Sequence, residues 1–127
     1  MSSIVVLRKI GGFYTCFDND AIIISYLCNY KIVNNRVGFP INTINKVSNL
    51  LDNNSISYII KNDDNEDKKI YGKKNKYNYY LDKGKKKIDI DYRVNDIIKK
   101  INDMKEEDIV SLLDLIEDRI NEWFYDC

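Results

Sequence analysis

The 127-residue sequence contains no histidine, and this absence removes most catalytic chemistry at neutral pH from consideration. Histidine is the usual general acid or base near pH 7, and it activates the nucleophile in Ser/His and Cys/His pairs. The five glycines also do not form the Gly-x-x-x-x-Gly-Lys-Ser/Thr frame of a phosphate-binding loop. We therefore expect a protein that is not an enzyme and that uses no cofactor.

Cysteines and long apolar runs are scarce as well. Cys16, Cys28 and Cys127 cannot all pair, and their spacing matches no zinc-binding pattern. No stretch reaches the roughly 20 apolar residues that span a bilayer, and the N-terminus lacks the charged and apolar regions of a secretion signal. We expect a cytoplasmic protein with no metal site and no membrane contact.

Carboxylates are the remaining candidates for catalysis. Asp18 and Asp20 follow one predicted strand, and Asp89 and Asp91 lie on another. Two or three such acids can hold Mg²⁺ for phosphodiester cleavage. Aspartates are equally common in loops and helix caps, so we favour the non-catalytic interpretation.

Charge is segregated along the chain although the formal net charge is zero. Nine lysines lie between Lys68 and Lys87 against the single acid Asp82, whereas nine acids lie between Asp103 and Asp126. The basic segment is suited to contact phosphates, because each lysine that neutralises a phosphate releases counterions. It is equally consistent with a solvated surface that balances the acidic segment.

Capping, turn and periodicity signals predict the order β-β-α-β-β-α-β for the first half of the chain. The predicted elements are strands at 4–7 and 13–17, a helix at about 18–29, strands at 30–33 and 36–39, a helix from about 42 to 53, and a strand at 57–61. Asn34-Asn35 suits a two-residue hairpin turn. Pro40 should end a strand, because proline lacks a backbone donor, and a helix should start near Asn42.

The second half of the chain has weaker signals. Strands are predicted near 69–71, 77–81 and 87–91, and two helices separated by a break near Asp103 follow them. The tyrosines among the lysines fit either a hairpin face or a stacking surface for single-stranded nucleic acid; they are Tyr71, Tyr77, Tyr79 and Tyr80.

We expect the α/β (α+β) class, with a mixed sheet flanked by helices and a C-terminal helical pair. The predicted domains are 1–92, which includes the basic hairpin, and 93–127, a helical extension that packs on the same core. An apolar stripe on the last helix should be buried by that packing; it consists of Leu112, Leu113, Ile116, Ile120 and Trp123. The alternative is that this helix binds a protein partner or forms a homodimer.

Residues 11–21 read Gly-Gly-Phe-Tyr-Thr-Cys-Phe-Asp-Asn-Asp-Ala, and Gly38-Phe39-Pro40 follows them. Over residues 4–61 the chain resembles the N-terminal mismatch-recognition domain (domain I) of MutS DNA mismatch-repair proteins, here as an isolated domain. The resemblance implies that Phe13 stacks into DNA as a wedge. Thr15 stands where the family has a glutamate that hydrogen-bonds the displaced base, which weakens the expectation of mismatch discrimination.

The resemblance and the charge pattern together predict a non-catalytic DNA-binding protein for distorted or mismatched DNA. The predicted contacts are Phe13, Tyr14, Thr15, Lys73, Lys74 and Lys76. Two alternatives stay open. Phe13 is equally suited to fill the core beneath a helix, and the chain could be a protein-interaction module that keeps the fold without recognising mismatches.

Overall fold

The computed structural model describes residues 3–125, which divide into two units between Ile88 and Asp89. We call them the sheet unit and the helical unit. The division falls at Ile88, within a continuous helix, whereas we expected it after Tyr92. Asp126 and Cys127, which we included in the acidic segment and in the cysteine count, lie outside the described residues.

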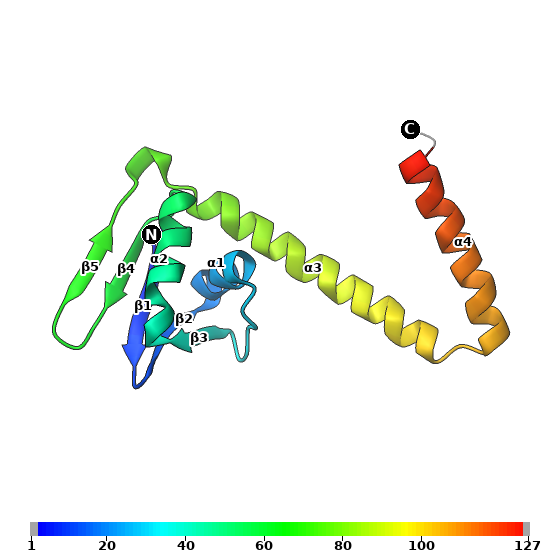
Figure 1. Cartoon of the computed structure of the whole chain (residues 1–127), viewed down its shortest axis with the longest axis horizontal. Helices are drawn as coiled ribbons and strands as arrows, with labels where there is room; N and C mark the ends of the chain where they lie inside the picture. Colours follow the sequence, from blue (N-terminus) through cyan, green and yellow to red (C-terminus); the bar gives the residue numbers. More distant parts are fainter. Residues whose placement is uncertain (1–2, 126–127) are drawn as a thin grey trace. The chain divides into compact units, whose positions relative to one another are not determined.

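The sheet unit is a five-stranded mixed sheet with helices (Figure 1). Its elements are β1 (Val5–Ile10), β2 (Phe13–Phe17), α1 (Asp18–Cys28), β3 (Arg36–Pro40), the 3-10 turn η1 (Ile41–Thr43), α2 (Ile44–Asn53), β4 (Tyr58–Lys61), β5 (Glu66–Lys69), the 3-10 turn η2 (Gly72–Lys74) and the first part of α3 (Tyr77–Asn102). The strand order is β3-β2-β1-β4-β5, with β1 parallel to β4 and every other pair antiparallel. The predicted α/β (α+β) class is therefore confirmed.

One face of the sheet packs against α1 and α2 and forms the core. Alternate strand residues point to this face, and the central strand β1 contributes Val5 and Leu7, both fully buried. The helices cover them with apolar side chains of the same cluster, among them Ile24 from α1 and Leu51 from α2. The opposite face of the sheet is left without a covering helix from residues 3–88, and we call it the open face.

The predicted asparagine turn is present. Asn34 and Asn35 have positive φ angles of 53° and 61°, and Val33 and Arg36 exchange both backbone hydrogen bonds across them, at 2.9 and 3.1 Å. Asparagine tolerates this left-handed conformation better than most residues. The predicted strand at 30–33 is wrong, however, since only Val33 forms a bridge.

The predicted junction at Pro40 is also present. Pro40 is the last residue of β3, and α2 begins at Ile44 after the short turn η1. The Thr43 hydroxyl donates to the Pro40 carbonyl at 2.7 Å instead of capping α2. The pattern Gly38-Phe39-Pro40 therefore predicted the strand-to-helix exit correctly.

The segment rich in tyrosine and lysine is helical, so the strands predicted at 77–81 and 87–91 are wrong. It forms α3, which begins at Tyr77. Tyr77, Tyr80, Leu81 and Gly84 follow the i, i+3, i+4, i+7 spacing of one helix face. Tyr77 belongs to the core, Tyr80 and Leu81 pack against it, and Gly84 lies against Ile22 of α1. These contacts outweigh the strand preference of tyrosine.

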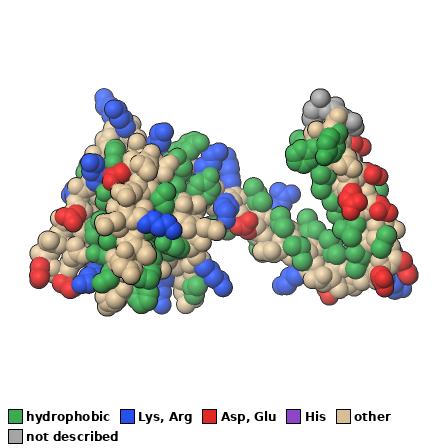
Figure 2. Space-filling view, viewed as in Figure 1, with side chains coloured by type: hydrophobic (Ala, Val, Ile, Leu, Met, Phe, Trp, Pro, Cys, Tyr) green, Lys and Arg blue, Asp and Glu red, His purple; other side chains and the backbone are tan. Residues whose placement is uncertain are grey.

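The helical unit consists of the second part of α3 and α4 (Glu106–Tyr125), with the break between them as predicted. No residue of α4 is buried, and Leu113, Ile120 and Trp123 expose 42%, 47% and 73% of their surface. Figure 2 shows hydrophobic side chains along one side of α4 and acidic ones along the other. Contacts within the helical unit therefore do not bury the expected apolar stripe of α4. The packing of this stripe on the sheet unit stays a prediction.

Candidate nucleic-acid interface

The open face carries a regular grid of side chains, because paired residues on neighbouring strands point to the same side of a sheet. Arg8 lies at its centre, with Thr15 of β2 as its partner on one side and Lys61 of β4 on the other. Phe17 is paired with Arg36 of β3. This face therefore carries both aromatic and basic side chains, together with polar and aliphatic ones.

Phe13 lies at one end of the open face, directly after the Gly11-Gly12 turn. Gly11 has a φ of +62°, a conformation that glycine adopts without strain. Phe13 is paired with Ile10 and Pro40, and 52% of its surface is exposed. It borders a shallow hollow whose lining also includes two cations; the lining residues are Ile10, Phe13, Thr15, Lys31, Val33, Arg36 and Gly38.

The positive charges of the open face are largely uncompensated. Among residues 3–125, Arg8, Arg36 and Lys68 form no ion pair. Lys61 is 3.9 Å from Glu66, and this pair is too long and exposed to neutralise much charge. The open face is therefore suited to an anionic ligand.

The structure separates the residues that we expected to form one DNA contact. Phe13 is exposed, so of the two positions that the sequence left open for it, the one in the core is wrong. Tyr14 points to the core, where its ring is tilted against that of Phe39 and its hydroxyl donates to Asn62. Tyr14 is thus a core residue, and its side chain lies on the opposite side of the sheet from Phe13. Thr15 lies on the open face with only 9% exposure, between Arg8 and Gly38 in the register.

The three predicted lysine contacts lie at the other end of the sheet from Phe13. Lys73 and Lys74 are in η2, and Lys76 donates its backbone N–H to Ser55 just before β4. Asn75, directly after η2, donates its side-chain N–H to the Ser3 carbonyl just before β1 at 2.6 Å, whereas Phe13 follows the other end of β1. At about 3.3 Å per residue, β1 separates the two places by roughly 17 Å. The lysines therefore do not flank Phe13 as we expected.

Most of the tyrosine cluster is used within the sheet unit. The hydroxyl of Tyr71 donates to Asp52 at 2.6 Å, that of Tyr77 to Asp20 at 2.6 Å, and that of Tyr80 to Asn54 at 2.8 Å. Because it donates to the Asp52 carboxylate, the pKa of Tyr71 is raised to about 12. These tyrosines join α3 and the segment after β5 to the rest of the unit, so they are not a free stacking surface.

Asp20 joins three elements by hydrogen bonds. It lies in α1, and its Oδ2 accepts the backbone N–H of Val6 in β1 at 3.0 Å while its Oδ1 accepts the hydroxyl of Tyr77 in α3. Burial raises the pKa of Asp20 above its ordinary value, although both hydrogen bonds oppose the increase. Both oxygens are thus engaged in the fold, and we assign Asp20 a structural role.

The raised pKa of Asp20 predicts a pH dependence of stability. The folded state holds the proton more tightly than the unfolded state, so this contribution is present below the ordinary pKa of about 3.9 and is lost as the pH rises through the raised value. Asp20→Asn removes the titrating group, and its amide can still hydrogen-bond Val6 and Tyr77.

We therefore expect the stability of the wild-type protein relative to Asp20→Asn to fall as the pH rises above the ordinary aspartate pKa of about 3.9. Urea unfolding at several pH values measures this difference. Asp64→Asn is the control, because Asp64 is exposed in the turn before β5 and is in no ion pair among the described residues, whereas its neighbour Asp63 pairs with Lys9. A constant difference between wild-type protein and Asp20→Asn would contradict the assignment.

The sequence interpretation missed the cations of the open face, chiefly Arg8, Arg36 and Lys61. The signal was strand alternation: in β1 the buried Val5 and Leu7 alternate with Val6 and Arg8. Alternation places Arg8 on the opposite face from the core, and the pairing of β1 with both β2 and β4 then places it at the centre. That pairing involves residues far apart in the chain, so no local sequence pattern predicts it.

Comparison with protein-family models gives no match, and comparison with curated proteins gives none. Among residues 3–125, no helix combines the length and the apolar character needed to cross a bilayer. Within the same residues, no three potential ligand side chains gather into a metal site. The assignment of function therefore depends on the geometry of the open face.

Proposed function

We propose that this chain binds DNA without catalysing a reaction on it, and that Phe13 and the open face make the contact. The observation that carries the proposal is the exposure of Phe13, at 52%, beside Lys31 and Arg36, which form no ion pair among the described residues. Cations supply the non-specific attraction to phosphates. An exposed aromatic ring beside them can enter between bases.

Distorted DNA is the preferred ligand under this proposal. Inserting a ring between base steps costs a few kcal/mol of unstacking, and a mismatch or kink has already lost part of that stacking. The MutS resemblance around Gly11, Phe13, Gly38 and Pro40 supports the same ligand. Thr15 supplies only a short neutral hydroxyl, nearly buried, so we expect little discrimination between one mismatched base and another.

Phe13→Ala is expected to reduce the preference for a mismatched over a matched duplex. The preference rests on stacking by this ring, so the loss should be about 5–100-fold in affinity for the mismatched duplex. The slope of log K against log salt should stay nearly unchanged, because no phosphate contact is removed. Fluorescence anisotropy with both duplexes at several salt concentrations measures both quantities.

Phe124→Ala is the matched control for this experiment, because Phe124 is an exposed phenylalanine, at 76%, in the helical unit. It should leave both affinities unchanged. No salt-dependent binding of either duplex by the wild-type protein at micromolar concentration would overturn the proposal. An unchanged mismatch preference in Phe13→Ala would overturn the role of the ring.

A second candidate function is protein interaction through the helical unit. The observation that favours it is α4, which has no buried residue and which carries an apolar stripe opposite an acidic side. Units below about 40 residues usually need additional contacts to be stable. A dimer mass measured in solution, lost in Leu113→Asp, would favour this candidate.

A further inference from the structure

The open face extends well beyond Phe13 as one continuous surface. Two rows of side chains lie next to each other on this face. The strand register gives the first row throughout. In the second row the pairing of β1 with β2 has already ended, at Arg8 and Thr15, and strand alternation alone places Phe17 and Val6 on the same face two residues further on. The first row is Gly38, Thr15, Arg8, Lys61 and Glu66, and the second is Arg36, Phe17, Val6, Ile59 and Lys68. Aromatic, basic and aliphatic side chains thus share one face of the sheet, and no helix from residues 3–88 covers it.

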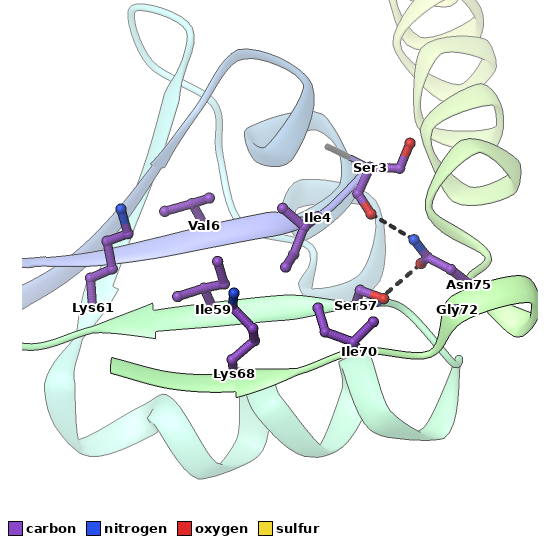
Figure 3. A pocket seen from close by; sticks show the side chains of 10 residues that line it. All are labelled: Ser3, Ile4, Val6, Ser57, Ile59, Lys61, Lys68, Ile70, Gly72 and Asn75. Carbon is purple, nitrogen blue, oxygen red and sulfur yellow. Dashed lines mark hydrogen bonds between the residues drawn. The ribbon is translucent and has the colours of Figure 1, made fainter. Parts of the chain in front are cut away.

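A hollow lies on this face over β1, β4 and β5 (Figure 3), with a volume of about 490 Å³. Val6 and Ile59 form an apolar floor, and Lys61 and Lys68 line the same hollow from β4 and β5. A nucleobase or sugar could rest on such a floor while the ammonium groups contact the adjoining phosphates.

Two exposed aromatic rings are available to stack with bases. Phe13 and Phe17 lie on the same face of β2, four residues apart, with exposures of 52% and 43%. At about 3.4 Å per residue the two positions are roughly 14 Å apart. This distance exceeds the separation of neighbouring stacked bases in a duplex, and it suits bases that are unpaired and spread along an extended strand.

The charges of the open face also favour a single-stranded nucleic acid. Arg8, Arg36, Lys61 and Lys68 carry four positive charges within the two rows, against the single carboxylate of Glu66. Flat sheet faces that combine cations with exposed aromatic rings are used to bind single strands, because every base has a face that can stack. A duplex hides those base faces and offers this surface only its phosphates.

We propose that the open face binds single-stranded DNA, with Phe17 stacking on an unpaired base and with Arg8 and Lys68 contacting phosphates. This inference rests on the proposed function and specifies its ligand: the strand that becomes unpaired beside the distortion entered by Phe13 crosses the face toward the hollow over β4 and β5. Phe17, Arg8 and Lys68 are therefore binding residues, separate from the wedge.

The test uses the full chain and three labelled probes: an oligothymidine single strand, a matched duplex and a duplex with one mismatch. Phe17→Ala is expected to weaken binding of oligothymidine by about 5–100-fold and to leave the matched duplex nearly unaffected. Arg8→Gln combined with Lys68→Gln should lower the salt slope for oligothymidine by about 1.4, which is about 0.7 for each phosphate contact on a single strand.

Matched controls change the same residue types elsewhere. Phe124→Ala controls for the loss of an exposed ring, and Arg93→Gln with Lys99→Gln controls for the loss of one arginine and one lysine. Both controls should bind oligothymidine like the wild-type protein. Circular dichroism of each variant shows whether the sheet unit is still folded, and a folded Phe17→Leu variant replaces Phe17→Ala if the latter unfolds.

The outcomes separate the two proposals. Salt-dependent duplex binding without binding of oligothymidine overturns this inference and leaves the proposed function standing. Binding of oligothymidine that is unchanged in the folded Phe17 and Arg8/Lys68 variants also overturns it. Failure of the wild-type protein to bind any of the three probes overturns both proposals.

Discussion

Leu7→Ala is expected to lower the free energy of unfolding of the sheet unit by about 2–5 kcal/mol. Leu7 lies on the central strand β1, is fully buried, and faces the core beneath α1 and α2. Truncation removes apolar surface from the core and leaves a cavity that strands paired on both sides of β1 cannot close easily.

An effect of this size is a large fraction of the total stability. Domains have a free energy of unfolding of roughly 0.05–0.15 kcal/mol per residue, so a unit of 88 residues is expected to have about 4–13 kcal/mol in total. Urea denaturation followed by circular dichroism measures the change. Ile10→Ala is the control on the same strand, because Ile10 is 50% exposed on the open face and its truncation should cost much less. Equal losses in the two variants would contradict the assignment of the faces.

Gly84→Ala is expected to destabilise the sheet unit by about 1–3 kcal/mol, the range for overpacking a close contact. A Cβ at this position would lie 2.6 Å from Ile22 Cγ2 and 3.0 Å from the Ile22 carbonyl oxygen. Helix propensity alone predicts the opposite sign, since alanine stabilises an exposed helix position by about 1 kcal/mol relative to glycine. The sign of the change therefore tests the contact between α3 and α1.

Lys85→Ala is the neighbouring control, because Lys85 is exposed on α3 and its replacement should change stability by less than about 0.5 kcal/mol. Gly84→Val should be more destabilising than Gly84→Ala, since it adds two further methyl groups beside the Ile22 backbone. Thermal unfolding of the full chain provides the comparison. A stabilised Gly84→Ala protein would show that α3 does not pack closely on α1.

The sequence pattern predicts the burial of β1 but not the helical environment of Gly84. β1 is a short apolar run before a glycine pair, and its burial follows from that pattern. Gly84 lies in a segment of lysines and tyrosines that favours a turn between two strands. Its helical conformation depends on the surface of α1, which no local pattern describes.

For the candidate site, the sequence alone identified Phe13 and the turn that presents it. The Gly11-Gly12 pair and strand alternation in β2 are enough to set Phe13 opposite Cys16. The same alternation places Tyr14 on the core side, so the DNA contact proposed for Tyr14 came from the family motif and not from the strand pattern. The relation between Phe13, Arg8 and Arg36 depends on strand pairing, which only the fold supplies.

The sequence by itself determined the features that have local causes: the strand-turn-strand-helix order of the first half, the asparagine turn at Asn34-Asn35, the exit at Pro40, and the α/β class. Tertiary structure alone decided that the chain from Tyr77 onward is a helix, that Asp20 joins α1 to β1 and α3, and that cations gather on an open sheet face away from Lys73 and Lys74. The physical reason is that turns and caps depend on neighbouring residues, whereas helix packing and sheet register bring together residues distant in the chain.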